Sequence, residues 1–136
     1  MKFLILTNVC LILLTGCQLI SPILTNYNGV RMDVASYINH AWRFSLKERE
    51  VLVAYAKQQQ KISSWHNLNS AKQHSLAEHR LIGRYCAEQK ISAKKLDLID
   101  QQIFSTIELQ TKLQAMYARQ QHIQLDYSSL NCEAKF

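Results

Sequence analysis

The sequence predicts an all-α fold, an irregular bundle of about four helices with one disulfide. Apolar side chains recur three and four positions apart through most of the chain after residue 33, which is the spacing of one buried helix face. No stretch alternates apolar and polar residues as a half-buried strand does, and the single proline is Pro22. We therefore expect residues 33–136 to form one helical domain.

The N-terminus has the parts of a secretory signal. Lys2 supplies positive charge, and a mostly apolar run extends from Phe3 to Leu14. The run ends in the tetrapeptide Leu14-Thr15-Gly16-Cys17, which resembles the lipobox of bacterial lipoproteins. The resemblance implies a signal peptide over residues 1–16, cleavage before Cys17, and diacylglycerol on the Cys17 thiol with further acylation of the new N-terminus, often by palmitate.

Two other interpretations of this stretch are weaker. A transmembrane helix needs roughly 20 apolar residues, whereas this run is shorter and is interrupted by Thr7 and Asn8. An ordinary secretory signal ends in a pattern such as Ala-x-Ala, which is missing. Gln18 follows the cysteine, and in enterobacterial lipoproteins an aspartate there retains the protein in the inner membrane. The resemblance therefore implies a lipid-anchored protein of the bacterial cell envelope, in the outer membrane and facing the periplasm.

Residues 17–32 are expected to be the lipidated N-terminus and a flexible tether. Ser21-Pro22 and the run Asn26-Tyr27-Asn28-Gly29 are signals of turns and loops. A tether of about 15 residues would let the domain stand off the bilayer.

Two capping signals mark the first two expected helices. Asp33 is a favoured residue for an N-cap. The run Ser45-Leu46-Lys47-Glu48 matches a capping box, so a second helix should begin at Leu46. The apolar stripes comprise Val34, Tyr37, Ile38, Ala41 and Trp42 in the first helix, and Val51, Leu52, Tyr55 and Ala56 in the second.

Two more helices are expected after a break over residues 63–70. The third should run from about residue 71 to 89. Gly83 inside it costs about 1 kcal/mol against alanine, and we interpret it as the mark of a close helix crossing. The fourth and longest should run from about residue 93 to 122, opened by Ser92. Its stripe comprises Leu96, Ile99, Ile103, Phe104, Ile107, Leu109, Leu113, Met116 and Tyr117.

The chain has four cysteines. Cys10 would leave with the signal and Cys17 would carry lipid, so Cys86 and Cys132 remain. An even pair in an oxidising compartment favours one disulfide. It would require the C-terminal tail to fold back. The alternative is two buried free thiols.

No sequence motif with an established catalytic mechanism occurs after the signal. His74, Glu78 and His79 lie close together on the third helix, but only His74 and Glu78 share a face, with His66 in the preceding loop. The pair Asp97 and Asp100 is no better than chance as a set of glycosidase acids. We therefore expect no metal, no cofactor beyond the covalent lipid, and no enzyme.

The net charge of +6 suits a solubilising surface, and the envelope address argues against a nucleic-acid partner. We expect most of the aromatic residues to fill the core, with Trp65 at a loop; a groove for a partner helix is the alternative. The aromatic residues in question are Tyr37, Trp42, Tyr55, Trp65 and Tyr85. Glutamines give the last expected helix a neutral polar side. That side either faces solvent or contacts another protein.

In size, anchor, helix content and cysteine pair the chain resembles the pilotins of type II secretion, which bind a secretin segment. No pilotin sequence motif is present, so the likeness is architectural. We expect a lipid-anchored adaptor or assembly factor that binds an envelope protein. The alternative is a regulatory or cell-wall-associated binding lipoprotein. No small-molecule substrate is evident, and the sequence does not locate the partner-binding residues.

Overall fold

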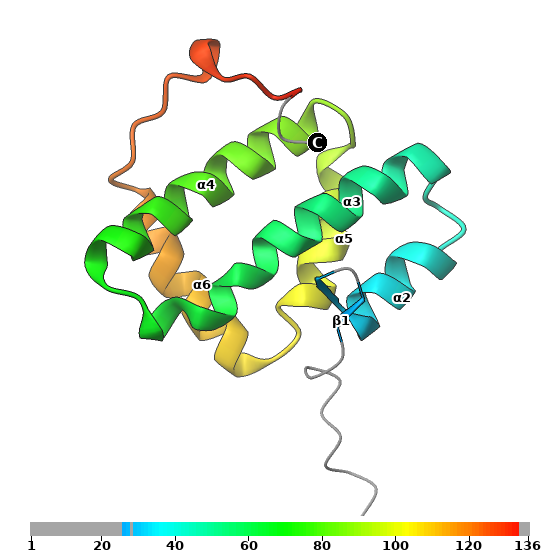
Figure 1. Ribbon diagram of the computed structural model, residues 1–136, viewed down its shortest axis with the longest axis horizontal. Coiled ribbons are helices and arrows are strands. Elements are labelled where there is room, and N and C mark those ends of the chain that lie inside the picture. The colour runs from blue at the N-terminus through cyan, green and yellow to red at the C-terminus, as the bar shows by residue number, and fades with distance from the viewer. Residues whose placement is uncertain (1–25, 28, 134–136) are drawn as a thin grey trace, which may run out of the picture.

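The computed structural model describes residues 26–27 and 29–133, so the predicted signal peptide and Cys17 lie outside the described residues. The described part is mostly helical and contains one disulfide, which confirms the predicted fold class (Figure 1). None of its helices is long and apolar enough to cross a bilayer. The elements are β1 (Asn26–Tyr27), β2 (Val30–Arg31), α2 (Met32–His40), α3 (Leu46–Gln59), the 3-10 helix η2 (Gln60–Asn67), α4 (Ser70–Glu88), α5 (Ala93–Ile103), α6 (Ile107–Gln120) and the 3-10 helix η3 (Tyr127–Ser129).

A small antiparallel hairpin precedes the first described helix, where a loose tether was expected. Tyr27 pairs with Val30, and Gly29 adopts the positive φ of 80° that a tight turn requires. Val30 is fully buried and Arg31 is 7% exposed. The expected tether up to Met32 is therefore wrong in its last part, because Val30 and Arg31 belong to the packed domain.

The predicted capping box is confirmed, whereas the predicted cap at Asp33 is wrong. The Ser45 backbone N–H donates to Glu48 Oε2 at 2.8 Å, and the Glu48 N–H donates to Ser45 Oγ at 3.3 Å. Helix α2 instead begins at Met32, with no side-chain cap. The Asp33 carboxylate binds the Arg31 guanidinium, which removes it from the role of a cap.

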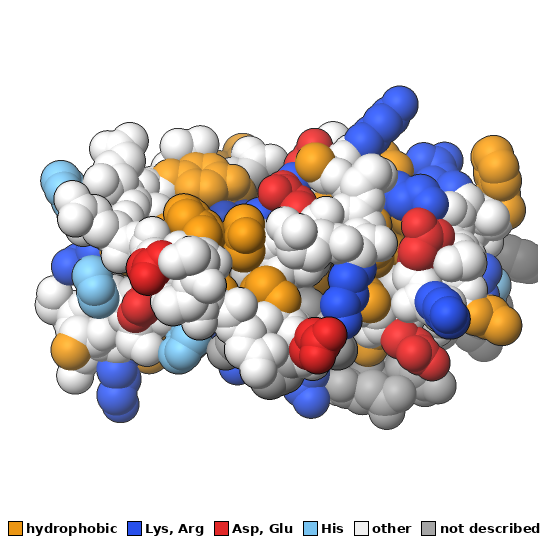
Figure 2. Space-filling model, turned by 90° about the horizontal axis from the view of Figure 1, so that it is seen from above, with side chains coloured by type: hydrophobic (Ala, Val, Ile, Leu, Met, Phe, Trp, Pro, Cys, Tyr) orange, Lys and Arg blue, Asp and Glu red, His pale blue; other side chains and the backbone are white. Residues whose placement is uncertain are grey.

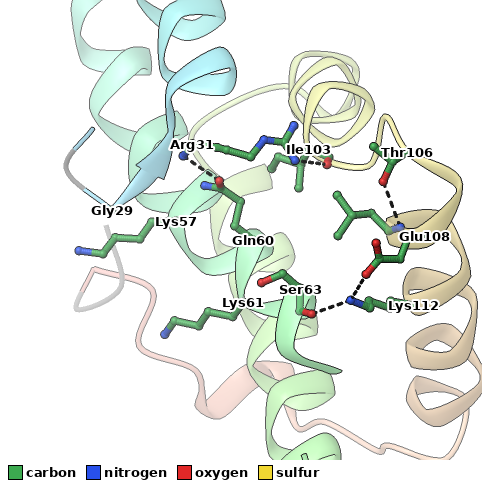
Figure 3. Close-up of a pocket in the computed structure, with 11 residues that line it drawn as sticks. Gly29, Arg31, Lys57, Gln60, Lys61, Ser63, Ile103, Thr106, Glu108 and Lys112 are labelled. Atoms are coloured by element: carbon green, nitrogen blue, oxygen red, sulfur yellow. Dashed lines mark hydrogen bonds and ion pairs between the residues drawn. The ribbon is translucent and has the colours of Figure 1, made fainter. Parts of the chain in front are cut away.

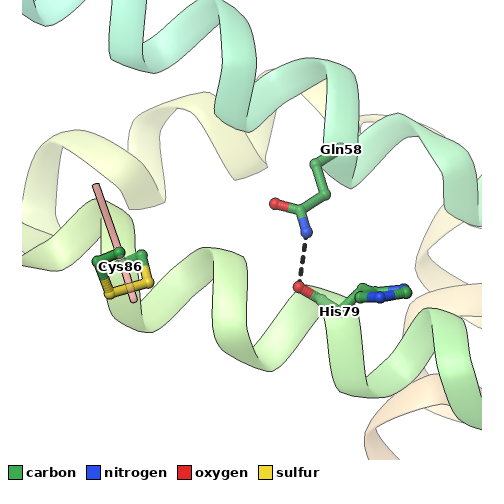
Figure 4. Close-up of a disulfide and its surroundings, with 4 residues drawn as sticks. Gln58, His79 and Cys86 are labelled. Atoms are coloured by element: carbon green, nitrogen blue, oxygen red, sulfur yellow. Dashed lines mark hydrogen bonds between the residues drawn. A yellow bond between two sulfur atoms is a disulfide. The ribbon is translucent and has the colours of Figure 1, made fainter. Parts of the chain in front are cut away.

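Helices α3 and α4 cross closely at Gly83, as its position in the sequence suggested. A Cβ atom on Gly83 would overlap the Gln58 amide. Gln58 Nε2 donates across the crossing to the His79 carbonyl at 2.6 Å (Figure 4). The glycine therefore makes room for a hydrogen bond between the two helices.

The expected long fourth helix is two helices, α5 and α6. The chain turns after Ile103, and Thr106 Oγ1 accepts a hydrogen bond from the Leu109 N–H at 3.3 Å, capping α6. Ile103 is 1% exposed, but Ile107 is 82% exposed. The prediction was wrong because the apolar spacing continues across the turn and hid the threonine cap.

One hydrophobic cluster lies between the helices, and the two tryptophans have exchanged the places expected for them. Trp42 follows the end of α2 and is 89% exposed, whereas Trp65 lies in η2 and is 3% exposed. Tyr55 is fully buried, as expected. The core comprises Val30, Val34, Ala35, Ile38, Phe44, Leu52, Tyr55, Ala56, Ile62, Trp65, Ala77, Ala87, Ile91, Leu96, Ile99, Ile103, Phe104, Leu109 and Met116.

The predicted disulfide between Cys86 and Cys132 is present. Their Cα atoms are 5.1 Å apart, within the range of unstrained bridges, and Cys86 is fully buried in α4 (Figure 4). The ring centroids of Tyr127 in the tail and Tyr85 in α4, which precedes Cys86, lie 4.7 Å apart. The tail after α6 thus returns along α4, as the pairing required (Figure 1).

We predict that Cys132→Ser lowers the free energy of unfolding by about 2–4 kcal/mol, because the bridge closes a loop of 46 residues and restricts the unfolded chain. Urea unfolding of the oxidised proteins measures the difference, with Asn131→Ser in the same tail as the matched control. Equal stability of the two variants, or free thiols at both positions in the denatured, unreduced protein, would contradict the prediction.

Candidate functional site

A cleft of about 570 Å³ opens between the hairpin, η2 and the start of α6 (Figure 3). Its volume lies within the range of ligand-binding pockets. It is lined by Gly29, Arg31, Lys57, Gln60, Lys61, Ser63, Ile103, Thr106, Glu108, Leu109 and Lys112. Four of the lining residues are cationic and one, Glu108, is anionic, while the buried Ile103 and Leu109 are apolar.

Arg31 holds the upper wall of the cleft together. Its guanidinium donates to the carbonyls of Gln102 and Ile103 at 2.8 and 3.1 Å, which lie at the C-terminal end of α5. Its backbone N–H donates to Gln60 Oε1 at 2.8 Å. Two further bonds of 2.7 Å join it to Asp33. Arg31 is therefore occupied by internal partners and acts as part of the wall.

The opposite wall is fixed by Lys112. Its ammonium donates to the Ser63 carbonyl at 2.7 Å and to Glu108 Oε1 at 2.6 Å, so α6 is tied to η2. The hydrogen bond and the charge of Lys112 lower the pKa of Glu108 from its ordinary value. The charges of Lys112 and Glu108 therefore compensate each other within the described residues.

Lys57 and Lys61 carry the uncompensated charge of the cleft. They are four residues apart, both are exposed, and neither ammonium has a hydrogen bond or ion pair within the described residues. Figure 3 shows both side chains on the wall opposite Glu108 and Lys112. The Lys57 chain passes beside Gly29, where a Cβ atom would lie 2.9 Å from Lys57 Cε. The cleft can thus attract carboxylates at its mouth and cover an apolar group inside.

A second group of charged side chains lies between α3, α4 and α5, away from the cleft. The Tyr55 hydroxyl donates to both Asp100 oxygens at 2.9 and 3.0 Å, and Arg84 and Arg80 reach the same carboxylate at 3.2 and 3.5 Å. Burial raises the pKa of Asp100 in spite of the two guanidinium groups. Burial, with the charge of Asp100, also raises the pKa of Tyr55. The Tyr55 hydroxyl and both guanidinium groups meet at Asp100, although Arg80 Nε is buried without a hydrogen-bond partner among the described residues. The group joins the three helices α3, α4 and α5.

Among the residues that the sequence offered for chemistry, Asp97 and Asp100 form ion pairs with Arg84, and His74 and His79 lie on the surface of α4. Asp97 contacts Arg84 at 2.8 Å, so it shares that guanidinium with Asp100. His74 and His79 are exposed on α4, and Ser75 Oγ lies 3.4 Å from His79 Nδ1. Among the described residues no three His, Cys, Asp or Glu side chains converge as metal ligands would.

No family model, curated protein or solved structure matches this chain, so its function is inferred from the cleft and from the predicted anchor. The residues of the cleft were not found from the sequence. The i, i+4 spacing of Lys57 and Lys61 was the one available signal, since it places two like charges on one helix face. Nothing in the local sequence of Arg31 or Lys112 shows that they meet partners far along the chain.

We predict that Asp33→Asn destabilises the fold at pH 7 and that the difference from the natural protein shrinks in acid. Burial opposes ionisation of Asp33, but the hydrogen bonds and charge of Arg31 prevail and lower its pKa below the ordinary 3.8. A lowered folded-state pKa means that ionised Asp33 stabilises the fold above pH 3.8 and that this contribution is lost as the pH falls through the folded-state pKa.

Urea unfolding of both proteins between pH 7 and the acid range measures this difference. Glu78→Gln is the control, because the Glu78 carboxylate has no hydrogen bond or ion pair within the described residues. A difference between Asp33→Asn and the natural protein that stays constant with pH would show that the charge of Asp33 is not what matters.

Proposed function

We propose that this protein is a lipid-anchored lipoprotein of the bacterial cell envelope whose helical domain binds another envelope protein, as an adaptor or assembly factor. The observation that carries the proposal is the cleft, in which Lys57 and Lys61 have no ion pair among the described residues and lie beside the apolar Ile103 and Leu109. Such a surface suits a protein segment that presents carboxylates and one apolar side chain.

The lipobox supports the anchored part of the proposal. Cys17 is preceded by Leu14-Thr15-Gly16, and residues 18–25 join it to the hairpin. A lipid on Cys17 supplies location without chemistry, while the domain supplies recognition. The outer membrane, facing the periplasm, is the proposed site, because Gln18 follows the cysteine.

The surroundings of the cleft favour a protein partner over a small molecule. Ile107 is 82% exposed and lies in sequence between Thr106 and Glu108, both of which line the cleft. An exposed apolar side chain on the same turn of α6 adds apolar contact surface outside the cavity, which a protein partner could cover. The architectural likeness to pilotins agrees with this kind of partner.

The anchor is tested by metabolic labelling. A labelled fatty acid should enter the natural protein and be absent from Cys17→Ser, because only the Cys17 thiol follows the lipobox. In fractionated cells Cys17→Ser should leave the membrane, while its domain retains the folded structure. Equal labelling of the two proteins would remove both the anchor and the proposed location.

The cleft is tested by reversing its free charge. We predict that Lys57→Glu with Lys61→Glu lowers recovery of the partner at least about ten-fold, because two attractions to the partner's carboxylates become repulsions. A ten-fold loss corresponds to about 1.4 kcal/mol of binding free energy. The measurement is crosslinking in whole cells, purification of this protein and quantitative identification of what it carries.

The matched control is Lys72→Glu with Lys94→Glu, because these lysines are exposed, lie outside the cleft and give the same change of net charge. Equal loss in both double variants would mean that overall charge, not the cleft, governs binding. Recovery of no specific protein, together with turnover of a wall fragment or lipid by the purified protein, would favour an enzyme.

A further inference from the structure

The corner between α2 and α3 exposes large apolar side chains. Trp42 is 89% exposed and Leu46 is 79% exposed, and together with the residues between them they form what we term the Trp42 corner, residues 42–47. Hydrophobic and basic side chains project together at the right-hand edge of Figure 2, the side on which α2 and α3 join in Figure 1. Trp42 is the most exposed of the large apolar side chains in the described part of the chain.

The Trp42 corner is firmly built, so its exposure does not come from a frayed loop. Phe44 is 2% exposed and packs edge-on against Tyr37, with ring centroids 6.0 Å apart. Arg49 donates to the carbonyl of Phe44 at 3.2 Å and to that of Ala41 at 3.5 Å. The capping box fixes the start of α3 immediately after. The fold thus holds Trp42 outward on a defined turn.

The charge around the Trp42 corner is positive. Arg43 and Lys47 are exposed and have no ion pair within the described residues. Glu48 is neutralised by Lys95 at 2.5 Å, which leaves Glu50 as the exposed carboxylate of this turn. Tryptophan is enriched at the interface between a bilayer and water, and lysine and arginine bind anionic lipid headgroups.

The bilayer is also within reach of the Trp42 corner. Residues 18–25 separate Cys17 from the hairpin, and an extended chain of that length spans at most about 30 Å. Helix α2 follows the hairpin directly and has 9 residues, a length of about 14 Å, before the corner. The corner thus lies about one length of α2 from the hairpin at which the tether joins the domain, and a tether from a lipid on Cys17 is short enough to keep the domain beside the bilayer.

We propose that the Trp42 corner is a second membrane contact, in which Trp42 and Leu46 insert among the headgroups of anionic phospholipids while Arg43 and Lys47 bind their phosphates. The inference rests on the proposed anchor for proximity. The high exposure of Trp42 and Leu46, and the absence of ion pairs to Arg43 and Lys47 among the described residues, favour a lipid surface over a protein partner. Such a contact would orient the domain, and its cleft, relative to the membrane.

The test uses the fluorescence of the full lipoprotein in vesicles. The chain has two tryptophans, and Trp65 is buried, so Trp42 reports on the corner and Trp65 is an internal reference. Vesicles of phosphatidylcholine, with or without phosphatidylglycerol, carry lipids brominated in the acyl chains. We expect bromine to quench at least a third of the emission, with more quenching when phosphatidylglycerol is present.

Two variants make the result specific. In Trp42→Phe the remaining emission should be insensitive to bromine, and Arg43→Glu with Lys47→Glu should abolish the dependence on phosphatidylglycerol. Equal emission in brominated and unbrominated vesicles would overturn the proposal. So would a Trp42 that becomes shielded only when solubilised envelope proteins are added, because the corner would then be a protein contact.

Failure of the anchor is recognised separately. Flotation of the vesicles shows whether the lipoprotein is anchored. If the protein does not float, it is coupled through its free Cys17 thiol to maleimide-bearing lipid, and quenching is measured again. Absence of flotation with strong quenching after coupling would contradict the anchor alone, and flotation without quenching would contradict the Trp42 corner alone.

Discussion

One buried guanidinium, that of Arg31, connects the parts of the molecule that form the cleft. It donates to two carbonyls at the C-terminal end of α5, where the last carbonyl groups of a helix have no N–H donor within that helix. The guanidinium is held in turn by the Asp33 carboxylate. The same residue donates its backbone N–H to Gln60. Loss of the side chain would leave buried acceptors unpaired, at about 1–3 kcal/mol each. The position of the hairpin, and with it the upper wall of the cleft, depends on this contact.

The features that the sequence predicted correctly are encoded locally or by elimination. The capping box at Ser45 needs only residues three apart, and the apolar stripe of α3 follows from helical periodicity. Gly83 signalled a close crossing because a glycine inside a helix is otherwise unfavourable. Cys86 and Cys132 were paired because the other cysteines were assigned to the signal and the lipid.

The features that the sequence did not predict depend on distant contacts. The turn between α5 and α6 interrupts an apolar repeat that has no interruption in the sequence, and the Thr106 cap is visible only once the turn is known. The burial of Trp42 and Trp65 was predicted in the wrong order, because Trp42 continues the apolar spacing of α2 beyond the end of that helix and Trp65 lies where the sequence indicated a break. Gln120 is buried and donates to the Ala77 carbonyl at 3.0 Å, although its place among glutamines was compatible with a solvent-facing side. The cleft is formed by residues from three separate stretches.

The central claim is that the cleft is where a partner protein binds, and photo-crosslinking from a single position tests it most directly. A photoreactive amino acid replaces Lys61 at the mouth of the cleft or, in a matched strain, the exposed Lys94 on α5. Irradiation of whole cells should give a discrete crosslinked species from position 61 and none from position 94. Identical patterns from the two positions, or no crosslinked species from position 61, would contradict the account.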